Sequence, residues 1–326
     1  MCGKLSENLE FWMTNLPVPL KDIPVINLAI PGTHDSMTYD MRALSPVAPD
    51  AEACVHVLHK FIPCVIKRWA VTQKLSLTEQ LLNGIRYLDF RISFRLPDAK
   101  YYFVHGLYCE EIVEALHEIR DFLESHPGEV IILDIQHMYQ FEEKNHSELM
   151  GMLQDVLGGK VWPRDGRLLK QWTPKVAWES GKQLLIIYRN HQAQFVQSFW
   201  TAEDWPTPWP NQTNVSKLKD YLEQSLSMRS PQQGFVTQCV LTPNISYTVP
   251  RFFSSLQRTC ARKVFRKLLS WIATQKPGPW RPGDQPTVNV ILADFVEIQN
   301  SEFCKIVVDL NLKLYTEKII TMESSA

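Results

Sequence analysis

The sequence lacks both a membrane-spanning segment and the start of a secretory signal. No stretch approaches the roughly 18 apolar residues that a transmembrane helix requires. The first residues, MCGKLSENLEFWM, have neither the basic start nor the apolar run of a signal peptide. We therefore expect a cytoplasmic protein.

Ordered cysteine pairs are also missing. The chain has seven cysteines, an odd number, and none of them belongs to a CxxC pair. This pattern is typical of reduced thiols and disfavours a disulfide framework or a zinc site. The cysteines are residues 2, 54, 64, 109, 239, 260 and 304.

No excess of one charge is present. Lys and Arg total 34 against 35 Asp and Glu, which gives a formal net charge of -1. Such a chain has no global field that would attract nucleic acid or an anionic surface. We expect no nucleic-acid partner and infer no obligate protein partner, so any attraction to an anionic surface must come from a local patch.

What the chain does contain is a series of short, nearly continuous apolar runs. Runs of this kind are typical of strands that are buried on both faces. They cover 25–30, 85–90, 101–105, 130–135, 183–188, 235–241 and 288–295. Helical patterns lie between several of them, at 76–83, 110–124, 145–157, 215–227, 252–274 and 302–315.

Strands that alternate with helices predict parallel β/α units. This number of strands in one chain favours an α/β fold, a distorted or incomplete TIM-type (β/α) barrel in a single domain, with a doubly wound open sheet as the alternative. We place the barrel at 22–300. Residues 1–21 then form an N-terminal extension, and 301–326 form a C-terminal helix and tail that pack on the barrel or flank it.

Polar side chains gather where the expected strands end. They are His34 and Asp35 after the first run, Asp89 and Arg91 in and after the second, His105 at the end of the third, and Asp294 in the last. In parallel barrels the active site is built at the C-terminal ends of the strands. We therefore expect these six side chains to meet in one pocket.

This set of residues suits the cleavage of a phosphodiester by an internal nucleophile. One imidazole can remove the proton of the attacking hydroxyl, and the other can protonate the leaving oxygen. An arginine can neutralise charge on the phosphate, and a carboxylate such as Asp294 can fix the tautomer of the basic histidine. Simpler interpretations exist, because His34 could cap a turn and Arg91 could form a structural ion pair with Asp89.

The same residues carry a family resemblance. IPGTHDS, followed in order by GIRYLDFR, VHG, ILDI and ILADF, resembles the X-domain of phosphatidylinositol-specific phospholipases C. The resemblance looks strongest to the stand-alone eukaryotic X-domain proteins, which lack further modules. It implies a distorted TIM barrel that cleaves phosphatidylinositol lipids to diacylglycerol and an inositol (cyclic) phosphate.

The resemblance also implies roles for individual residues. His34 matches the general base toward the inositol 2-hydroxyl, and Asp294 the carboxylate that orients it. His105 corresponds to the general acid for the diacylglycerol oxygen, and Arg91 to the arginine on the phosphate. Asp35 matches the aspartate beside the base, and these five residues form the expected catalytic set.

Three further positions are expected to bind the substrate. Asp89 matches the aspartate just before the arginine. Gln136 stands where the bacterial enzymes have a lysine, and Arg189 is the counterpart of an arginine that contacts inositol.

The resemblance further implies that no metal and no cofactor is used. Calcium-dependent members of the family have an Asn where Asp35 stands, an acidic residue in place of Arg91 and a Glu near Gln136. Calcium prefers several carboxylate oxygens, and a guanidinium would repel it while supplying its own positive charge. The pattern therefore matches the metal-independent bacterial enzymes, and calcium is not expected.

An enzyme with a lipid substrate must reach a membrane surface, which we expect to be a transient, peripheral contact. Tryptophan is favoured at that interface, and Trp200, Trp205 and Trp209 lie in one loop at 198–210. We expect these three to contact the membrane, with packing inside the protein as the alternative. The basic helix 252–274 could also lie on an anionic surface and is equally an ordinary outer helix.

Two other functions compete with this interpretation. The first is a catalytically weak or inactive adaptor that binds phosphoinositides, which would need no pair of acid and base. The second is another barrel phosphodiesterase that uses a metal held by acidic residues, which Arg91 disfavours.

Overall fold

The computed structural model describes residues 4–281 and 283–316, and its centre is an eight-stranded sheet. Six strands run parallel in the order β6-β5-β2-β1-β8-β7. Their bounds are β1 Ile30–Thr33, β2 Tyr87–Arg95, β5 Ile131–Tyr139, β6 Leu184–Tyr188, β7 Val236–Gln238 and β8 Val290–Ala293. Within the described residues no ladder joins β6 to β7, so the sheet is the incomplete barrel that the sequence predicts.

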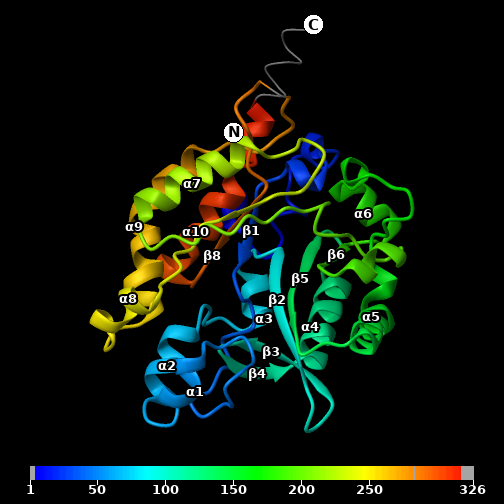
Figure 1. Ribbon diagram of the computed structural model, residues 1–326. Helices are drawn as coiled ribbons and strands as arrows, with labels where there is room; N and C mark the ends of the chain where they lie inside the picture. The colour runs from blue at the N-terminus through cyan, green and yellow to red at the C-terminus, as the bar shows by residue number, and fades with distance from the viewer. Residues whose placement is uncertain (1–3, 282, 317–326) are drawn as a thin grey trace, which may run out of the picture.

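Helices surround this sheet, on its outside and at the C-terminal ends of its strands (Figure 1). They are α1 Ala53–Leu58, α2 Pro63–Ala70, α3 Leu77–Leu82, α4 Ile112–Ser125, α5 Glu143–Leu157, α6 Pro174–Ser180, α7 Val215–Ser227, α8 Ile245–Thr248, α9 Arg262–Thr274 and α10 Ile298–Asp309. The start of α3 shows how the local sequence fixes where a helix begins. Ser76 and Glu79 form a reciprocal capping box that satisfies two free N–H groups. None of the described helices is long and apolar enough to cross a bilayer.

The strands are buried on both faces because two separate apolar cores enclose them. Side chains such as Leu88 and Leu133 point outward and pack with the apolar stripes of α4, α5, α7 and α9. Their neighbours Tyr87 and Ile132 point inward and form the core inside the barrel. The two cores explain why the strands appear as continuous apolar runs in the sequence.

The N-terminal segment closes the barrel at the N-terminal ends of its strands. Trp12, Leu16 and Leu20 are buried in the inner core. The Glu129 carboxylate accepts hydrogen bonds from the backbone N–H of Thr14, at 2.9 Å, and from Arg86 Nη2, also at 2.9 Å. The described part of the expected N-terminal extension thus covers the end of the barrel opposite His34.

The chain ends expected to flank the barrel also meet each other. The Ser6 hydroxyl donates to Asp309 Oδ2 at 2.7 Å, which joins the start of the chain to α10. Residues 1–3 and 317–326, which belong to the expected extension and tail, lie outside the described residues. So does Cys2, while the other six cysteines are free thiols.

The segment between Trp200 and Pro206 fills the gap between β6 and β7. The Trp200 backbone exchanges two hydrogen bonds of 2.9 Å with β6, and the Pro206 carbonyl accepts from Val236 N–H in β7 at 3.0 Å. Trp200 is 2% exposed and Trp205 is fully buried in the inner core. The expectation that these two tryptophans contact a membrane is therefore wrong, because both side chains pack in the inner core where the sheet has no strand between β6 and β7.

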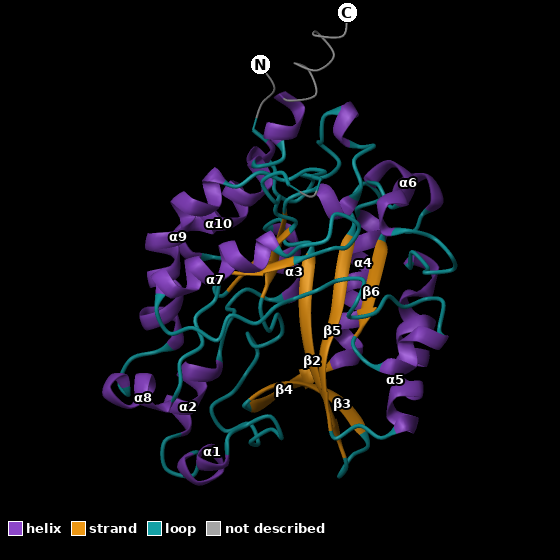
Figure 2. Ribbon diagram, turned by 45° about the horizontal axis from the view of Figure 1, so that its top comes forward, coloured by secondary structure: helices purple, strands orange, loops and turns teal. Residues whose placement is uncertain are grey.

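Two of the expected strands differ from the prediction. The first begins at Ile30 rather than at residue 25, because Pro24 starts a short 3-10 turn at Val25–Asn27. The third, β3 Lys100–His105, runs antiparallel to β2 and continues into β4 Leu107–Glu111 (Figure 2). The apolar run predicts a buried strand but does not predict the direction in which the strand runs. In the structure only four residues join β2 to β3, which is too few for the crossover that a parallel pair requires.

The expected helix at 252–274 is interrupted. It begins with a π-helical turn at Gln257–Ala261 and continues as α9. Val264 and Leu268 are buried in the outer core, and the arginines face outward. Of the two alternatives given for this segment, the structure therefore fits the ordinary outer helix.

We predict that Gly234→Ala destabilises the protein by about 1–3 kcal/mol, the usual cost of overpacking a filled core. A Cβ atom at Gly234 would lie 2.0 Å from the Trp205 ring. Denaturant unfolding measures the change. Gly151→Ala in α5 is the matched control, because nothing lies within 4 Å of its added Cβ, and it should stabilise by about 0.5–1 kcal/mol. Equal effects of the two variants would contradict this packing.

Candidate active site

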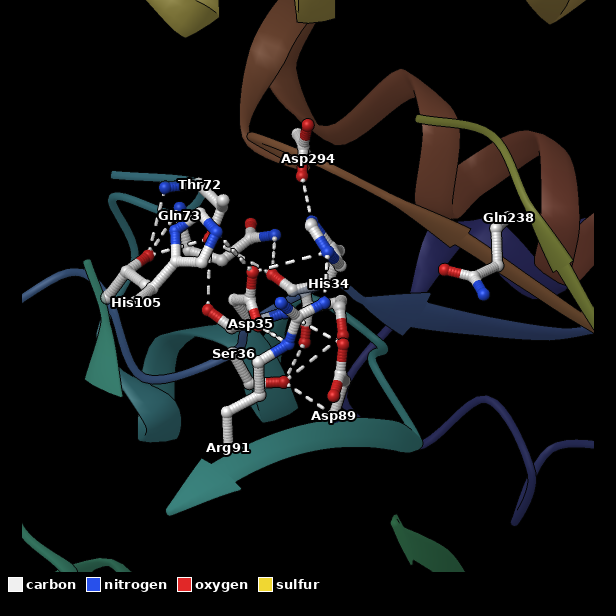
Figure 3. Close-up of polar contacts among 12 residues, drawn as sticks. His34, Asp35, Ser36, Thr72, Gln73, Asp89, Arg91, His105, Gln238 and Asp294 are labelled. Carbon is white, nitrogen blue, oxygen red and sulfur yellow. Dashed lines mark hydrogen bonds and ion pairs between the residues drawn. The ribbon is translucent and has the colours of Figure 1, made fainter. Parts of the chain in front are cut away.

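His34 and His105 lie on opposite sides of one carboxylate, that of Asp35 (Figure 3). Asp35 Oδ2 is 3.2 Å from Nε2 of each histidine. The other oxygen, Oδ1, forms an ion pair with Arg91 Nε. The sequence expected these four side chains to meet, and the structure brings them together.

The parallel register of β1 and β8 places His34 beside Asp294. Thr33 pairs with Ala293, so the next residue of each strand leaves the sheet at the same point. His34 Nδ1 lies 2.8 Å from Asp294 Oδ1. Because a carboxylate accepts, Nδ1 carries the hydrogen, and Nε2 of a neutral His34 is left with its lone pair.

His105 reaches the site from the antiparallel strand β3, not from a parallel barrel strand. Phe103 pairs with Ile92, so the end of β3 returns to the level of Arg91. His105 Nδ1 donates to the Ala70 carbonyl at 2.6 Å, and this fixes Nε2 toward Asp35. The sequence placed His105 correctly in the pocket but for the wrong topological reason.

The segment that follows α2 holds the backbone of the first histidine in place. The Thr72 hydroxyl is 3.1 Å from the His34 carbonyl, and the Gln73 amide donates to the same oxygen at 3.0 Å. Asp35 has a left-handed φ of 41°, a conformation that aspartate tolerates better than most residues. Its backbone N–H donates to Asp89 Oδ2 at 3.1 Å.

Asp89 is therefore a support for Asp35. It is buried, and it does not line the main cavity. Burial and the neighbouring Asp35 charge raise the pKa of Asp89 to about 6. The expected contact between Asp89 and a substrate does not fit this position.

The charges of the site change the pKa values of His34 and Asp35. Burial alone would lower the pKa of His34, but the Asp35 and Asp294 carboxylates outweigh it and raise the pKa. Burial would raise the pKa of Asp35, but Arg91 and His105 outweigh burial and lower it. Asp35 is therefore ionised at neutral pH and stabilises a proton on His34.

A bulge in β5 changes which side chain lies beside Arg91. The register moves from Phe90 opposite Ile135 to Arg91 opposite His137, so Gln136 is the extra residue. Burial lowers the pKa of His137, and the Arg91 charge lowers it further. His137 is thus the cross-strand neighbour of Arg91, although it is exposed and does not line the cavity, and the residue pattern could not predict this because it does not reveal a bulge.

Arg189 lies deeper than expected. Its guanidinium makes two hydrogen bonds to Asp134, of 2.8 and 2.6 Å, and a third to the Trp205 carbonyl. It does not line the main cavity. In this structure Arg189 holds strands β5 and β6 and the gap-filling segment together, and its part in substrate binding stays a prediction.

A cavity of about 450 Å³ opens above the histidines. Its floor includes His34, Arg91, His105 and Asp294. The Trp209 ring covers part of this floor, with its centroid 5.3 Å from that of His34 and 5.9 Å from Arg91 Cζ. Of the three tryptophans expected at a membrane, Trp209 is the one that is half-exposed at the cavity.

One group of potential metal ligands lies in the site. Atoms of His34, Asp35 and Asp89 lie within 4.8 Å of one another. Arg91 contacts two of these three residues, because Nε pairs with Asp35 and Nη2 lies 3.0 Å from His34 Nε2. A guanidinium therefore stands where a metal ion would have to bind, and the donor set does not suit a cation.

Comparison with known proteins gives relatives that span nearly the whole chain. PI-PLC X domain-containing protein 3 from Homo sapiens is 36% identical over 316 residues, 95% of each chain. Protein 2 from Mus musculus is 37% identical over 92% of this chain and 87% of its own. The chain belongs to the PI-PLC X domain-containing proteins. No family model matches it.

Solved structures agree with the observed fold of this X-domain protein. The phosphatidylinositol-specific phospholipase C from Listeria monocytogenes has a TM-score of 0.63 at 20% identity, over 93% of this chain and 98% of its own. A mutant of the Staphylococcus aureus enzyme gives 0.67 at 15% identity, over 94% and 98%. The predicted family and barrel type are thus confirmed.

We predict that Asp294→Asn lowers the pKa of His34. The raised pKa depends partly on the negative charge of Asp294, and asparagine removes that charge. NMR titration of the His34 imidazole should give a value above the ordinary value of about 6.5 in the parent protein and a lower one in the variant. Asp155→Asn, a change on the exposed face of α5, is the control and should leave the titration unchanged. An unshifted His34 in Asp294→Asn would contradict the assigned contact.

Proposed function

We propose that this protein is a phosphatidylinositol-specific phospholipase C that uses His34 and His105 as base and acid without a metal. The observation that carries the proposal is the placement of two imidazole Nε2 atoms, each 3.2 Å from the same oxygen of Asp35. Each ring has its Nδ1 bound to an acceptor, so both reactive nitrogens face one small space. The bacterial structures of this fold carry that activity in their names.

In the first step His34 Nε2 takes the proton of the inositol 2-hydroxyl as its oxygen attacks phosphorus. The imidazolium that forms is stabilised by Asp294. His105 gives its proton to the glycerol oxygen as the bond between phosphorus and that oxygen breaks. The products are diacylglycerol and a cyclic inositol phosphate, which the same pair can open with water in reversed roles.

Arg91 supplies the positive charge that a metal provides in other phosphodiesterases. Asp35 holds the guanidinium by Nε, and Nη2 points to His34. The neighbouring carboxylates of Asp35 and Asp89 keep the pKa of Arg91 above its ordinary value, although burial opposes this. A fixed, permanently charged guanidinium suits the charge that develops on the phosphate in the transition state.

The membrane contact is made by a rim of exposed apolar side chains around the cavity mouth. We define the rim as Phe61 from the loop between α1 and α2, together with Ile245, Val249 and Phe253 around α8. They are 77%, 55%, 65% and 85% exposed. The two segments lie side by side (Figures 1 and 2), and Arg68 on α2 donates to the Phe253 carbonyl. Exposed apolar groups gathered at a cavity mouth are typical of interaction sites. In this proposal the rim, and not the buried Trp200 and Trp205, touches the membrane. The enzyme is cytoplasmic, and its contact with the membrane is transient and peripheral.

A purely binding role accounts for less of the site. An adaptor that only holds inositol lipids needs neither a pair of histidines with fixed tautomers nor a carboxylate shared between them. The Trp209 ring lies over His34, and it would favour an adaptor if it blocked the access of a substrate to this histidine. His34 nevertheless lines the open cavity, so a substrate can reach it.

We expect the protein to release water-soluble inositol phosphate from phosphatidylinositol vesicles in the presence of EDTA. The reason is that Arg91 already occupies the position of a cation in the site. Product analysis by phosphorus NMR identifies the cyclic and acyclic phosphates. Activity that disappears in EDTA and returns with calcium would overturn the metal-free mechanism.

We also expect His34→Ala and His105→Ala each to lower the turnover by about 10²–10⁴-fold, because proton transfer by a positioned side chain contributes that much. The pH dependence of the parent enzyme should be bell-shaped, since one histidine must be neutral and the other protonated. His191→Ala, at an exposed position, is the control and should be fully active. Near-normal turnover by either active-site variant would remove that residue from its role.

A further inference from the structure

The cavity is polar at its floor and apolar along its walls. We call the apolar part the groove and define it by residues of two facing segments. One wall comes from α1 and α2 and the other from the segment that leads from β7 to the π-helical turn. The groove residues are Val55, Ile62 and Val65 on the first wall and Leu241, Phe252 and Leu256 on the second.

Charge excludes an anionic occupant from the walls. Among the described residues that line the cavity, the charged groups outside the floor are Asp50 and Glu52, both acidic. Asp50 is already engaged, because its carboxylate accepts from Gly106 N–H at 2.8 Å. No lining lysine or arginine besides Arg91 is available in this part of the chain to bind a further phosphate. The groove therefore fits a neutral, apolar ligand.

The groove also begins on the correct side of the catalytic pair. Helix α2 ends at Ala70, and the Ala70 carbonyl is the group that holds His105 Nδ1. The first wall therefore ends at the group that holds the general acid. His105 protonates the leaving oxygen, so whatever is attached to that oxygen must extend from His105 into the groove.

We infer that the groove binds a hydrocarbon chain of the lipid whose phosphodiester is being cleaved. This inference rests on the proposed function and adds that the protein, and not only the bilayer, recognises the chain. A cavity of about 450 Å³ lies within the usual range of about 300–1,000 Å³ for ligand pockets. A single lipid molecule outside any membrane is then a competent substrate, provided that its chain is long enough to fill the groove.

Buried apolar area sets the size of the expected effect. Transfer of one methylene group from water to an apolar site is favourable enough to raise an equilibrium constant about fourfold. For monomeric substrates, kcat/KM should therefore rise by up to about fourfold with each methylene until the groove is full. Recognition by the bilayer alone predicts no such rise, because a monomer has no bilayer around it.

The test uses lysophosphatidylinositols of increasing chain length below their aggregation concentrations, with glycerophosphoinositol as the chain-free reference. The full chain is assayed for kcat/KM, and His105→Ala is titrated with the same lipids for Kd. Rising kcat/KM and falling Kd with chain length support the groove. Values that do not depend on chain length in both series overturn it.

Two matched variants separate the groove from the exposed surface. Val55→Asn places an amide in the groove and should lower the ratio of long-chain to chain-free kcat/KM by about tenfold. Val57→Asn makes the same change two residues away on α1, at a position that does not line the cavity, and should keep the ratio. Val65→Asn on α2 repeats the test from the other helix. Equal ratios in all four proteins would contradict the groove.

The design also separates this inference from the proposed function. A parent protein that cleaves neither vesicles nor monomers would refute the phospholipase activity, while the Kd series would still test the groove. Cleavage of vesicles together with a flat chain-length series would refute the groove and leave the activity in place.

Discussion

A buried carboxylate, Asp35, lies within contact distance of an arginine and two histidines, and the rest of the active site depends on it. A charge in this position would be very costly without partners, so Asp35, its three partners and the fold stabilise one another. The backbone N–H of Asp35 in turn donates to the Asp89 carboxylate, and the backbone of Asp35 has a left-handed φ. The loop after β1 is therefore as much a part of the candidate site as the two histidines on either side of Asp35.

The barrel achieves this arrangement with an incomplete sheet. Where a strand is missing between β6 and β7, tryptophans fill the space, and the carbonyl of Trp205 accepts a hydrogen bond from Arg189. Arg189 is bound to Asp134 on β5, and the Tyr87 hydroxyl donates to the same carboxylate at 2.6 Å. One buried network thus links β2, β5 and the residue after β6 beneath the site, and Arg189 is part of it.

Much of this could be predicted from the sequence, and the failures have physical causes. The fold class follows from the apolar runs, and the meeting of His34 with Asp294 follows from the parallel ends of β1 and β8, while Arg91 and His105 reach the same site from β2 and the antiparallel β3. Strand direction was not predictable from burial, so the antiparallel β3 was missed. Nor was the bulge that brings His137 beside Arg91, because an extra residue changes the register without changing the pattern. Tryptophan is favoured both in cores and at interfaces, so its location in the fold could not be decided from residue type.

The short hairpin of α1 and α2 joins the features that a lipid substrate requires. The loop between its helices carries Phe61 of the rim, its inner face carries the first wall of the groove, and its last residue, Ala70, fixes the tautomer of His105. Thr72, two residues further on, contacts the backbone of the base. The hairpin and the residues that follow it therefore connect the apolar surface to both histidines of the site. Because the hairpin holds His105 through a backbone carbonyl, the geometry of this contact depends on how the hairpin packs, and in the proposed mechanism a lipid chain against its inner face would keep that packing in place.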